Sequence, residues 1–157
     1  CAVPSALEEA AAFGRWWFDP ETNQIVLSAQ SARYLNVESL HHQGLDSCLI
    51  HVVSEDMLCL IEQLSGRVPP TAKSDFRVIS AVDGLRWLRM TQMPVDAANP
   101  GLVCGILADI TALQHAAMRE RLGFELTEFL VGSHSLGDAI TNVIPLICKN
   151  LGWDWGA

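Results

Sequence analysis

The stretch Cys104–Met118, CGILADITALQHAAM, changes character at its middle. Up to Ala108 it is short and apolar with a glycine inside it, as in a buried strand, and from Ile110 onward it is rich in Ala, Leu, Gln and Arg, as in a helix. Only the tripeptide DIT, residues 109–111, separates the two patterns. Its aspartate can cap the first turn of the helix, so the sequence predicts a strand that passes directly into a long helix.

Alternating apolar runs upstream predict further strands. The run GRWWFDPETNQIVLS, residues 14–28, has aromatic or aliphatic residues on both sides of a segment with Pro20 and Asn23, which is the pattern of a β-hairpin. The next part of the chain is helical in pattern, and Ser54 is placed to cap the second of two short helices. The predicted elements are two strands within 14–28, helices at 29–36 and 54–66, and strands at 74–80, 85–95 and 102–109.

This order of two strands, several short helices and three strands describes an α+β fold, a five-stranded antiparallel sheet with helices packed on one face. Strand alternation puts Trp16 and Phe18 on a common face. The final strand is apolar on both faces, so we expect both faces of the sheet to be covered. Trp17 points opposite to Trp16, and the N-terminal segment or a second chain would cover it.

Composition limits the class of protein. The 157 residues are half hydrophobic and carry a formal net charge of -8, which argues against nucleic acid or an anionic membrane as a partner. No apolar run approaches the roughly 20 residues that span a bilayer, and the N-terminal segment lacks the pattern of a signal peptide. The five cysteines are scattered without a CxxC pair, as expected for free thiols in a cytoplasmic protein.

Four motifs occur in an order and spacing that match one family. They are GRWWFD at 14–19, HVVSED at 51–56, FRVISAVDGLRWL at 76–88 and GILADIT at 105–111. With these motifs the chain resembles PAS domains, of the subgroup whose signature runs from G.W..D through H..ED and DG..RW to G...DIT. The resemblance implies a PAS domain at residues 14–111.

The resemblance gives the junction between strand and helix a role. In PAS proteins the last strand commonly ends at this Asp-Ile-Thr and continues into a helix that joins the sensor to the next domain, which implies a signalling helix at 112–132. The residues of signal coupling are then Asp109, Ile110 and Thr111. We expect the Asp109 carboxylate to cap the helix or to pair with Arg86 or Arg89 on the neighbouring strand. The alternative is that Asp109 is a surface cap with a local role only.

The predicted signalling helix has two interpretations. Its apolar residues form a loose heptad seam, interrupted by polar residues, which suits a dimer helix. The same stripe suits an amphipathic helix that packs on its own domain. The stripe consists of Ile110, Leu113, Ala117, Phe124 and Val131.

Both ends of the chain extend beyond the PAS resemblance. PSALEEAAAF predicts an N-terminal helix within residues 1–13, which stops at Gly14. At 133–157, an apolar helix followed by LGWDWGA is similar to the start of a GAF domain, without the remaining GAF strands. The chain therefore looks like part of a longer signalling protein of bacterial type, with a kinase or nucleotide cyclase as its output.

Apolar side chains on the inner face of the sheet and on the helices form the candidate ligand pocket of a PAS sensor. Plain core packing is the alternative for each of them, and a core filled to ordinary density would make the chain a ligand-free interaction and dimerisation module. The candidate pocket residues are Trp16, Phe18, Leu27, Ile50, Met57, Ile61, Phe76, Val78 and Ile106.

Cofactor patterns are weak, so we expect no bound cofactor. Some PAS relatives hold a haem, which needs a histidine that faces the pocket. Among His41, His42 and His51 the last is the candidate ligand, although its place in the H..ED motif suits fixing a helix start. A flavin bound as in light-sensing LOV relatives needs a reactive cysteine, and Cys48 lies at a comparable place without the flanking residues of that motif.

Catalysis and metal binding have no pattern in the sequence. It contains no GxSxG, HExxH or P-loop motif and no metal-ligand spacing, so we expect neither a catalytic residue nor a metal site. We expect the chain to form a homodimer through the N-terminal helix, the outer sheet face or the helix after Asp109. The other expected partners are the adjacent GAF-like and output domains and a small-molecule ligand.

Overall fold

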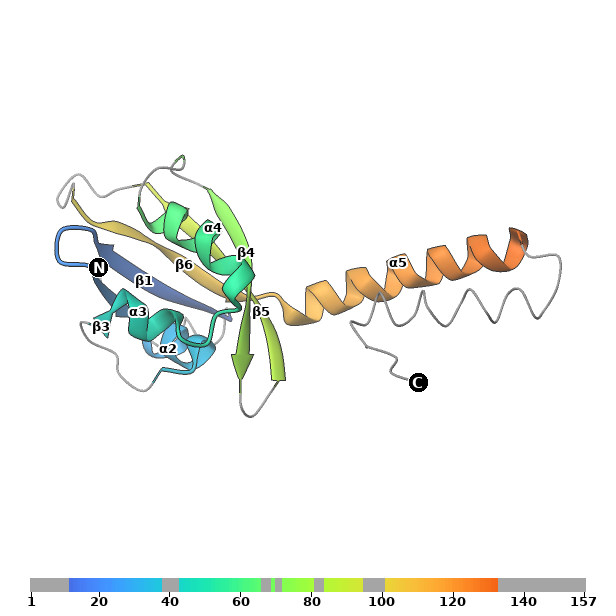
Figure 1. The fold of residues 1–157 in the computed structure, drawn as a ribbon, viewed down its shortest axis with the longest axis horizontal. Helices are drawn as coiled ribbons and strands as arrows, with labels where there is room; N and C mark the ends of the chain where they lie inside the picture. Colours follow the sequence, from blue (N-terminus) through green and yellow to red (C-terminus); the bar gives the residue numbers. More distant parts are fainter. Residues whose placement is uncertain are drawn as a thin grey trace. The chain divides into compact units, whose positions relative to one another are not determined.

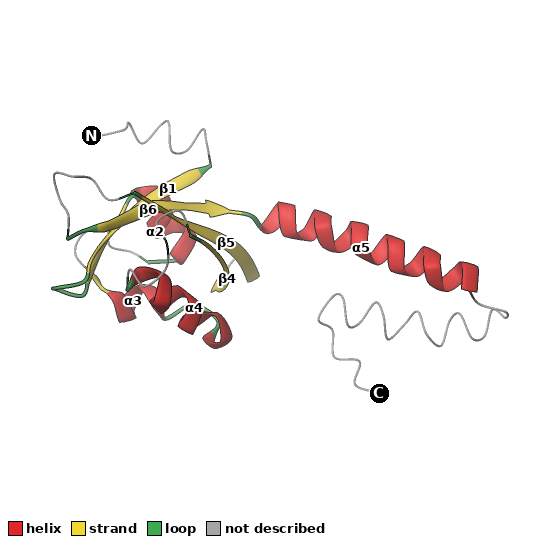
Figure 2. Ribbon diagram, turned by 90° about the horizontal axis from the view of Figure 1, so that it is seen from above, coloured by secondary structure: helices red, strands yellow, loops and turns green. Residues whose placement is uncertain are grey.

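The structure, a computed structural model, describes residues 12–37, 43–65, 69, 72–80, 84–94 and 101–132. The chain divides into two compact units, Cys1–Thr111 and Ala112–Ala157. The first unit contains one antiparallel sheet with three short helices on one of its faces (Figure 1, Figure 2). The predicted α+β class, with a five-stranded antiparallel sheet and helices on one face, is therefore confirmed.

Five strands of four to ten residues and a two-residue edge strand make up the sheet. Their spatial order is β3-β2-β1-β6-β5-β4, so β1 and β6 pair at its centre although they are far apart in the chain. The sequence does not predict β3, because two residues show no alternation. The strands are β1 (Phe13–Asp19), β2 (Gln24–Leu27), β3 (Gln43–Gly44), β4 (Lys73–Ser80), β5 (Gly84–Met93) and β6 (Val103–Asp109).

The hairpin between β1 and β2 turns where the sequence predicts it. Asn23 adopts a positive φ of 55°. The Asp19 carboxylate accepts hydrogen bonds from the Thr22 hydroxyl at 2.8 Å and from the Glu21 N–H at 2.9 Å, and these bonds lower the pKa of Asp19. This side-chain turn fixes the register between the two strands.

Three short helices connect β2 to β4. They are α2 (Ala29–Leu35), α3 (Leu45–Leu49) and α4 (Ser54–Leu64). Ser28 caps α2, because its Oγ accepts a hydrogen bond from the Ser31 N–H at 3.4 Å. The helix ends at Asn36, whose φ of 60° is left-handed.

The predicted N-cap of α4 is wrong by one residue. Ser54 is the first helical residue, and Val53 occupies the cap position without a side-chain hydrogen bond. The Val53 N–H donates instead to the Arg77 carbonyl at 2.9 Å, which holds the start of α4 against β4. Glu55 and Asp56 lie in the first turn, where negative charge is favourable.

The hydrophobic core lies between the three helices and the inner face of the sheet. Alternation along the strands is as predicted, and Trp16 is fully buried. Gly105 lies opposite Trp16 on β6, and a Cβ at this position would lie 2.7 Å from the Trp16 ring and would also clash with the Thr91 carbonyl. The indole Nε1 donates to the Ile106 carbonyl at 3.2 Å, so the ring is held in this place.

Several predictions concern segments at the two ends. The N-terminal helix predicted within 1–13 lies outside the described residues, except that Ala12 lies in a turn and Phe13 begins β1. The GAF-like segment at 133–157 also lies outside them. The helix predicted at 112–132 is present as α5 (Thr111–Gly132), on which Leu113 and Phe124 are exposed.

The predicted stripe on this helix is not uniform. Its first member, Ile110, precedes α5 and is buried in the first unit, whereas Leu113 and Ala117 are exposed. The Val131 side chain lies outside the described part of the chain. Neither a dimer seam nor packing on its own domain follows from these exposures, and both stay predictions.

Candidate functional site

Five of the predicted pocket residues lie together on the inner face of the sheet. All are buried, each with at most 5% of its surface exposed. They are Trp16, Phe18, Leu27, Phe76 and Val78. Met57 on α4 is half-buried and packs against the same cluster.

The structure places three other candidates elsewhere. Ile50, which follows α3, is 72% exposed, and Ile61 on α4 is 42% exposed because Leu60 and Leu64 take the inward positions of that helix. Ile106 lies on the outer face of the sheet, since it pairs in register with Arg15, whereas inward Trp16 pairs with Gly105. These three side chains do not face the inner cluster. The prediction for Ile106 is wrong because β6 is apolar on both faces, so hydrophobicity does not indicate which of its residues point inward.

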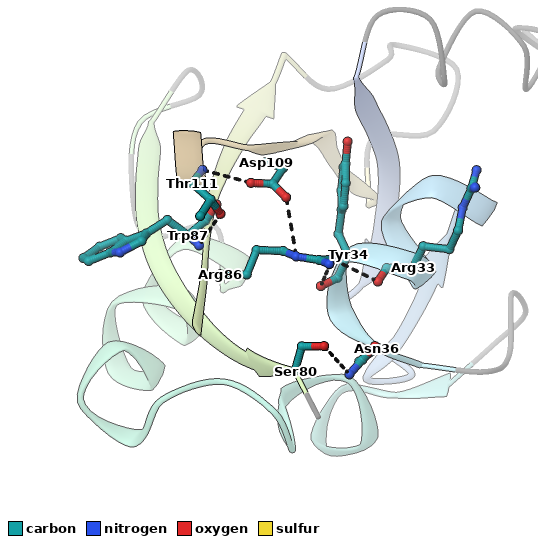
Figure 3. A network of polar contacts seen from close by, with 8 residues as sticks. All are labelled: Arg33, Tyr34, Asn36, Ser80, Arg86, Trp87, Asp109 and Thr111. Atoms are coloured by element: carbon teal, nitrogen blue, oxygen red, sulfur yellow. Dashed lines mark hydrogen bonds and ion pairs between the residues drawn. The ribbon is translucent and has the colours of Figure 1, made fainter. Parts of the chain in front are cut away.

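The junction after β6 is a compact polar site. The Asp109 carboxylate accepts a hydrogen bond from the Thr111 N–H at 2.9 Å. Thr111 in turn accepts from the Trp87 N–H through Oγ1 at 2.9 Å, and the Ile110 N–H donates to the Trp87 carbonyl at 2.9 Å. The start of α5 is therefore fixed to the middle of β5 by main-chain atoms of one tryptophan (Figure 3).

Arg86 connects this junction to α2. Its Nε lies 3.4 Å from Asp109 Oδ2, which confirms Arg86 as the partner of Asp109. Its Nη1 donates to the main-chain carbonyls of Arg33 at 3.3 Å and Tyr34 at 3.5 Å, at the carbonyl end of α2. The negative end of a helix dipole favours a cation at this place. The guanidinium also lies 6.0 Å from the centre of the Tyr34 ring, and Figure 3 shows it between α2 and Asp109.

A second polar contact ties α2 to the sheet. The Asn36 amide donates to the Ser80 hydroxyl at the end of β4 at 3.3 Å. Arg89, the other predicted partner of Asp109, is paired with Asp75 across β4 and β5 at 2.6 and 2.7 Å. This pair raises the pKa of Arg89, and it leaves Arg86 as the link between α2 and the junction.

Arg77 forms an ion cluster with the start of α4. Its Nε and Nη2 donate to Asp56 at 2.8 and 2.9 Å, and Nη2 also donates to Glu55 at 2.6 Å. Hydrogen bonding with Arg77 lowers the pKa of Asp56, and the two carboxylates raise the pKa of Arg77. The guanidinium lies 5.6 Å from the centre of the Trp87 ring, so it also contacts the residue that anchors Thr111.

The candidate haem ligand His51 and the candidate flavin-binding Cys48 lie in different surroundings. His51 is half-buried, and its carbonyl accepts the Ile79 N–H at 2.8 Å. Cys48 is buried, and burial raises the pKa of its thiol to about 11, which suppresses thiolate chemistry at neutral pH. His41 and His42 lie outside the described residues. In the described part of the chain, no three His, Cys, Asp or Glu side chains gather as a metal site would require.

The outer face of the sheet carries a hollow of about 390 Å³ beside the β1–β2 hairpin. Trp17 lines it together with Val26 and Leu102, and the Arg15 guanidinium lies 5.2 Å from the centre of the Trp17 ring. The outer position of Trp17 agrees with strand alternation. The surface of the hollow is mainly apolar, and Asp19, Thr22 and Gln24 also line it.

Sequence patterns miss several polar groups of the inner layer and the junction. The contact from Arg86 to the α2 carbonyls joins residues about fifty positions apart, and no local pattern indicates it. Gln63 and Gln92 are buried, and here a signal exists, because Gln92 alternates in phase with Leu88 and Met90. A polar residue in phase with core positions is unusual, so this pattern indicates a buried polar group at Gln92.

Known protein families and curated proteins give no match to this chain. Among solved structures, the described fold is similar to a sensory box histidine kinase/response regulator from Burkholderia thailandensis, at 18% identity and a TM-score of 0.58 over 77% of this chain and 94% of that one. The N-terminal domain of a diguanylate cyclase with a PAS/PAC sensor from Marinobacter aquaeolei has 17% identity and a TM-score of 0.51, over 66% of this chain and 98% of that one.

An RNA-binding light-oxygen-voltage receptor is similar with a TM-score of 0.55 and 15% identity, over 76% of this chain and 34% of that one. At these identities the likeness shows the fold. Of these neighbours, the diguanylate cyclase domain carries a PAS/PAC sensor by name, and the fold of the present chain is the PAS fold. Within the described residues, no helix combines the length and apolarity needed to cross a membrane.

Proposed function

We propose that this chain is the sensory PAS module of a multidomain signalling protein, which transmits a ligand or cofactor state through α5. It has no catalytic residue of its own in this proposal, and adjacent GAF-like and output domains, a kinase or a nucleotide cyclase, carry the activity. The module works as a homodimer in the cytoplasm. The PAS fold and its sensor neighbours support the class of function.

The observation that carries the proposal is the bridge made by Arg86. One guanidinium contacts carbonyls of α2, which covers the inner layer, and the Asp109 carboxylate, which holds the first N–H of α5. A shift of α2 changes the position of Arg86 and therefore its attraction for Asp109. The Trp87 N–H also holds Thr111, so a weaker contact between Arg86 and Asp109 changes the geometry of the first turn of α5 and does not release α5 from β5.

The inner cluster around Trp16 and Phe76 is the proposed contact surface for the ligand. Ile50, Ile61 and Ile106 drop out of the ligand contacts in this proposal because their side chains face elsewhere. We keep His51 as the candidate ligand should the module hold a haem, and we expect no cofactor in the module. A Soret band that disappears in a His51→Ala variant would show that the module is a haem sensor.

Replacement of Asp109 tests the coupling. Asp109→Ala removes the acceptor for the Thr111 N–H and the partner of Arg86, and we expect a loss of about 0.5–2 kcal/mol, as for a helix cap. The full-length variant should fold and bind its ligand, while its output no longer follows the stimulus. Melting temperature and stimulated output, measured on the same variant, distinguish a coupling role of Asp109 from a local cap. A lower melting temperature with an intact response would leave Asp109 a local cap and would contradict the coupling.

A ligand-free interaction module is the second candidate function. The observation that favours it is the apolar hollow on the outer face, lined by Trp17, Val26 and Leu102. A partner surface or a second copy would bury this face, and the module would set the geometry of the assembly without binding a small molecule. A response that depends on Trp17 but on no inner-face residue would select this function.

A further inference from the structure

A pair of facing side chains on β4 and β5 lies between the start of α4 and the start of α5. Arg77 on β4 and Trp87 on β5 are partners in the strand register, and the Arg77 guanidinium lies 5.6 Å from the centre of the Trp87 ring. Both residues are half-buried. A cation at this distance from an indole is attracted by the π electrons of the ring, so the two side chains hold one another.

The main-chain groups of Arg77 bond to the start of α4. The Arg77 N–H donates to the Asp56 carboxylate at 2.8 Å, and the Arg77 carbonyl accepts from the Val53 N–H at 2.9 Å. The guanidinium also donates to Asp56 at 2.8 Å and to Glu55 at 2.6 Å. Arg77 is therefore fixed to the first turn of α4 by both its main chain and its side chain, and a displacement of α4 moves the guanidinium.

The main-chain groups of Trp87 bond in the opposite direction, to the junction. The Trp87 N–H donates to Thr111 Oγ1 at 2.9 Å, and the Trp87 carbonyl accepts from the Ile110 N–H at 2.9 Å. The main-chain groups of Arg77 and Trp87 thus point away from one another. In an antiparallel pair of this kind the two side chains are at their closest. The contact between guanidinium and indole therefore links the residue anchored to α4 with the residue anchored to the junction.

We propose that Arg77 and Trp87 form a second coupling path, which carries a displacement of α4 to Ile110 and Thr111. This proposal rests on the proposed sensory function, in which α5 carries the output, and it adds an input from α4 to the input from α2. The two paths use adjacent residues of β5 on opposite faces of the sheet, and Figure 3 shows the Trp87 ring directed away from Arg86. Trp87 is a positioning residue in this path, because it acts on the junction through its main chain.

Hydrogen exchange of the Trp87 main-chain amide tests the path, because this amide exchanges when its bond to Thr111 opens. The exchange is followed by NMR on the full ¹⁵N-labelled chain. The slowest amides of β1 and β6 give the opening constant of global unfolding. Subtracting this constant from that of the Trp87 amide leaves the local opening constant of the junction, which a uniform loss of stability does not change.

Asp56→Asn weakens the hold of α4 on the guanidinium, and we expect the local opening constant to rise about two- to fivefold, the effect of losing an exposed cation–π contact. Asp75→Asn is the matched control. It removes the carboxylate partner of Arg89 on the same two strands and should leave the local opening constant unchanged. In Trp87→Leu the constant should already be raised, and the addition of Asp56→Asn should change it no further.

Three results would overturn the proposal: an unchanged local constant in Asp56→Asn, an equal rise in Asp75→Asn, or an effect of Asp56→Asn that persists in the Trp87→Leu background. Trp87 lies outside the inner core, so Trp87→Leu alone is decisive where Asp56→Asn does not fold. A wild-type local constant in that variant would also overturn the proposal. The test uses neither stimulus nor output, so its failure leaves the path through Arg86 and the sensory function standing.

Discussion

Arg77 joins the first turn of α4 to β4 through two carboxylates, and Asp56 is the more enclosed of the two. The guanidinium reaches Asp56 with two of its nitrogens, and the Arg77 N–H donates to the same carboxylate at 2.8 Å. α4 has no side-chain cap, and the bonds from Arg77 fix the start of this helix to β4 instead. Single residues therefore position the helix layer on which the proposed sensing depends.

This pairing predicts how stability changes with pH. The folded-state pKa of Asp56 lies below its ordinary value of 3.8, so the pair stabilises the fold fully above that value and loses its contribution as pH falls through the lower folded-state pKa. We expect Asp56→Asn to be less stable than wild type at pH 7 by about 1–3 kcal/mol, the cost of losing hydrogen bonds to a charged group. Thermal melts from pH 7 to about pH 2 measure this, and the two curves should converge at the acidic end. Parallel curves would mean that Asp56 does not carry the acid sensitivity.

At the scale of elements, the contact of Gly105 with Trp16 shows how β1 and β6 form the centre of the sheet. The side chain of Trp16 lies over the glycine, and its Nε1 bond to the Ile106 carbonyl prevents the ring from moving away. Any side chain at position 105 therefore meets both the ring and the Thr91 carbonyl. A glycine inside a strand is ordinarily unfavourable, and here close packing requires it.

We therefore expect Gly105→Ala to destabilise the fold by about 1–3 kcal/mol through overpacking. Gly101→Ala is the matched control, because a Cβ at residue 101 has no heavy atom within 4 Å. Chemical denaturation of the two variants measures the difference. Equal stability of both variants would show that the core accepts the added methyl group and that the packing described here is loose.

The long elements could be predicted from the sequence because each has a period or a turn signal of its own. The run at 76–88 alternates, the hairpin carries Pro20 and Asn23, and DIT marks the change from β6 to α5. β3 could not be predicted, because its pairing with β2 is decided by tertiary contacts and not by a pattern of two residues. The same limit applies to the cap of α4, where a bond from Val53 to the neighbouring strand replaces the expected serine.

The candidate site was predictable to a smaller extent. Alternation identifies the inner-face residues of β1 and β4, and the choice between Arg86 and Arg89 depends on the strand register, which pairs Arg89 with Asp75. Ile106 was misassigned because β6 is apolar on both faces, so hydrophobicity alone carries no information on its direction. The link from Arg86 to α2 is tertiary and invisible in any short window of sequence.

At the scale of the whole molecule, the outer face predicts self-association. Trp17 and the hollow beside it give this face an apolar area, and we expect the chain to be a homodimer at micromolar concentration. Trp17→Ser should weaken the dimer while the fold persists, because the Trp17 side chain lies outside the inner core. Light scattering across a dilution series measures the mass. A wild-type monomer at every concentration would contradict the predicted dimer. A dimer whose mass Trp17→Ser leaves unchanged would show that the interface does not include Trp17.

We propose that Arg86 carries a change in the helix layer to the start of α5. The most direct measurement is the ratio of output with and without stimulus in the full-length protein, for Arg86→Gln and for Arg89→Gln as the matched control. Both variants lose one arginine of β5, but the Arg89 side chain pairs with Asp75 and the Arg86 side chain with α2 and Asp109. We predict a wild-type ratio for Arg89→Gln and a ratio near one for Arg86→Gln, with both proteins folded. An undiminished ratio in Arg86→Gln would contradict this role of Arg86.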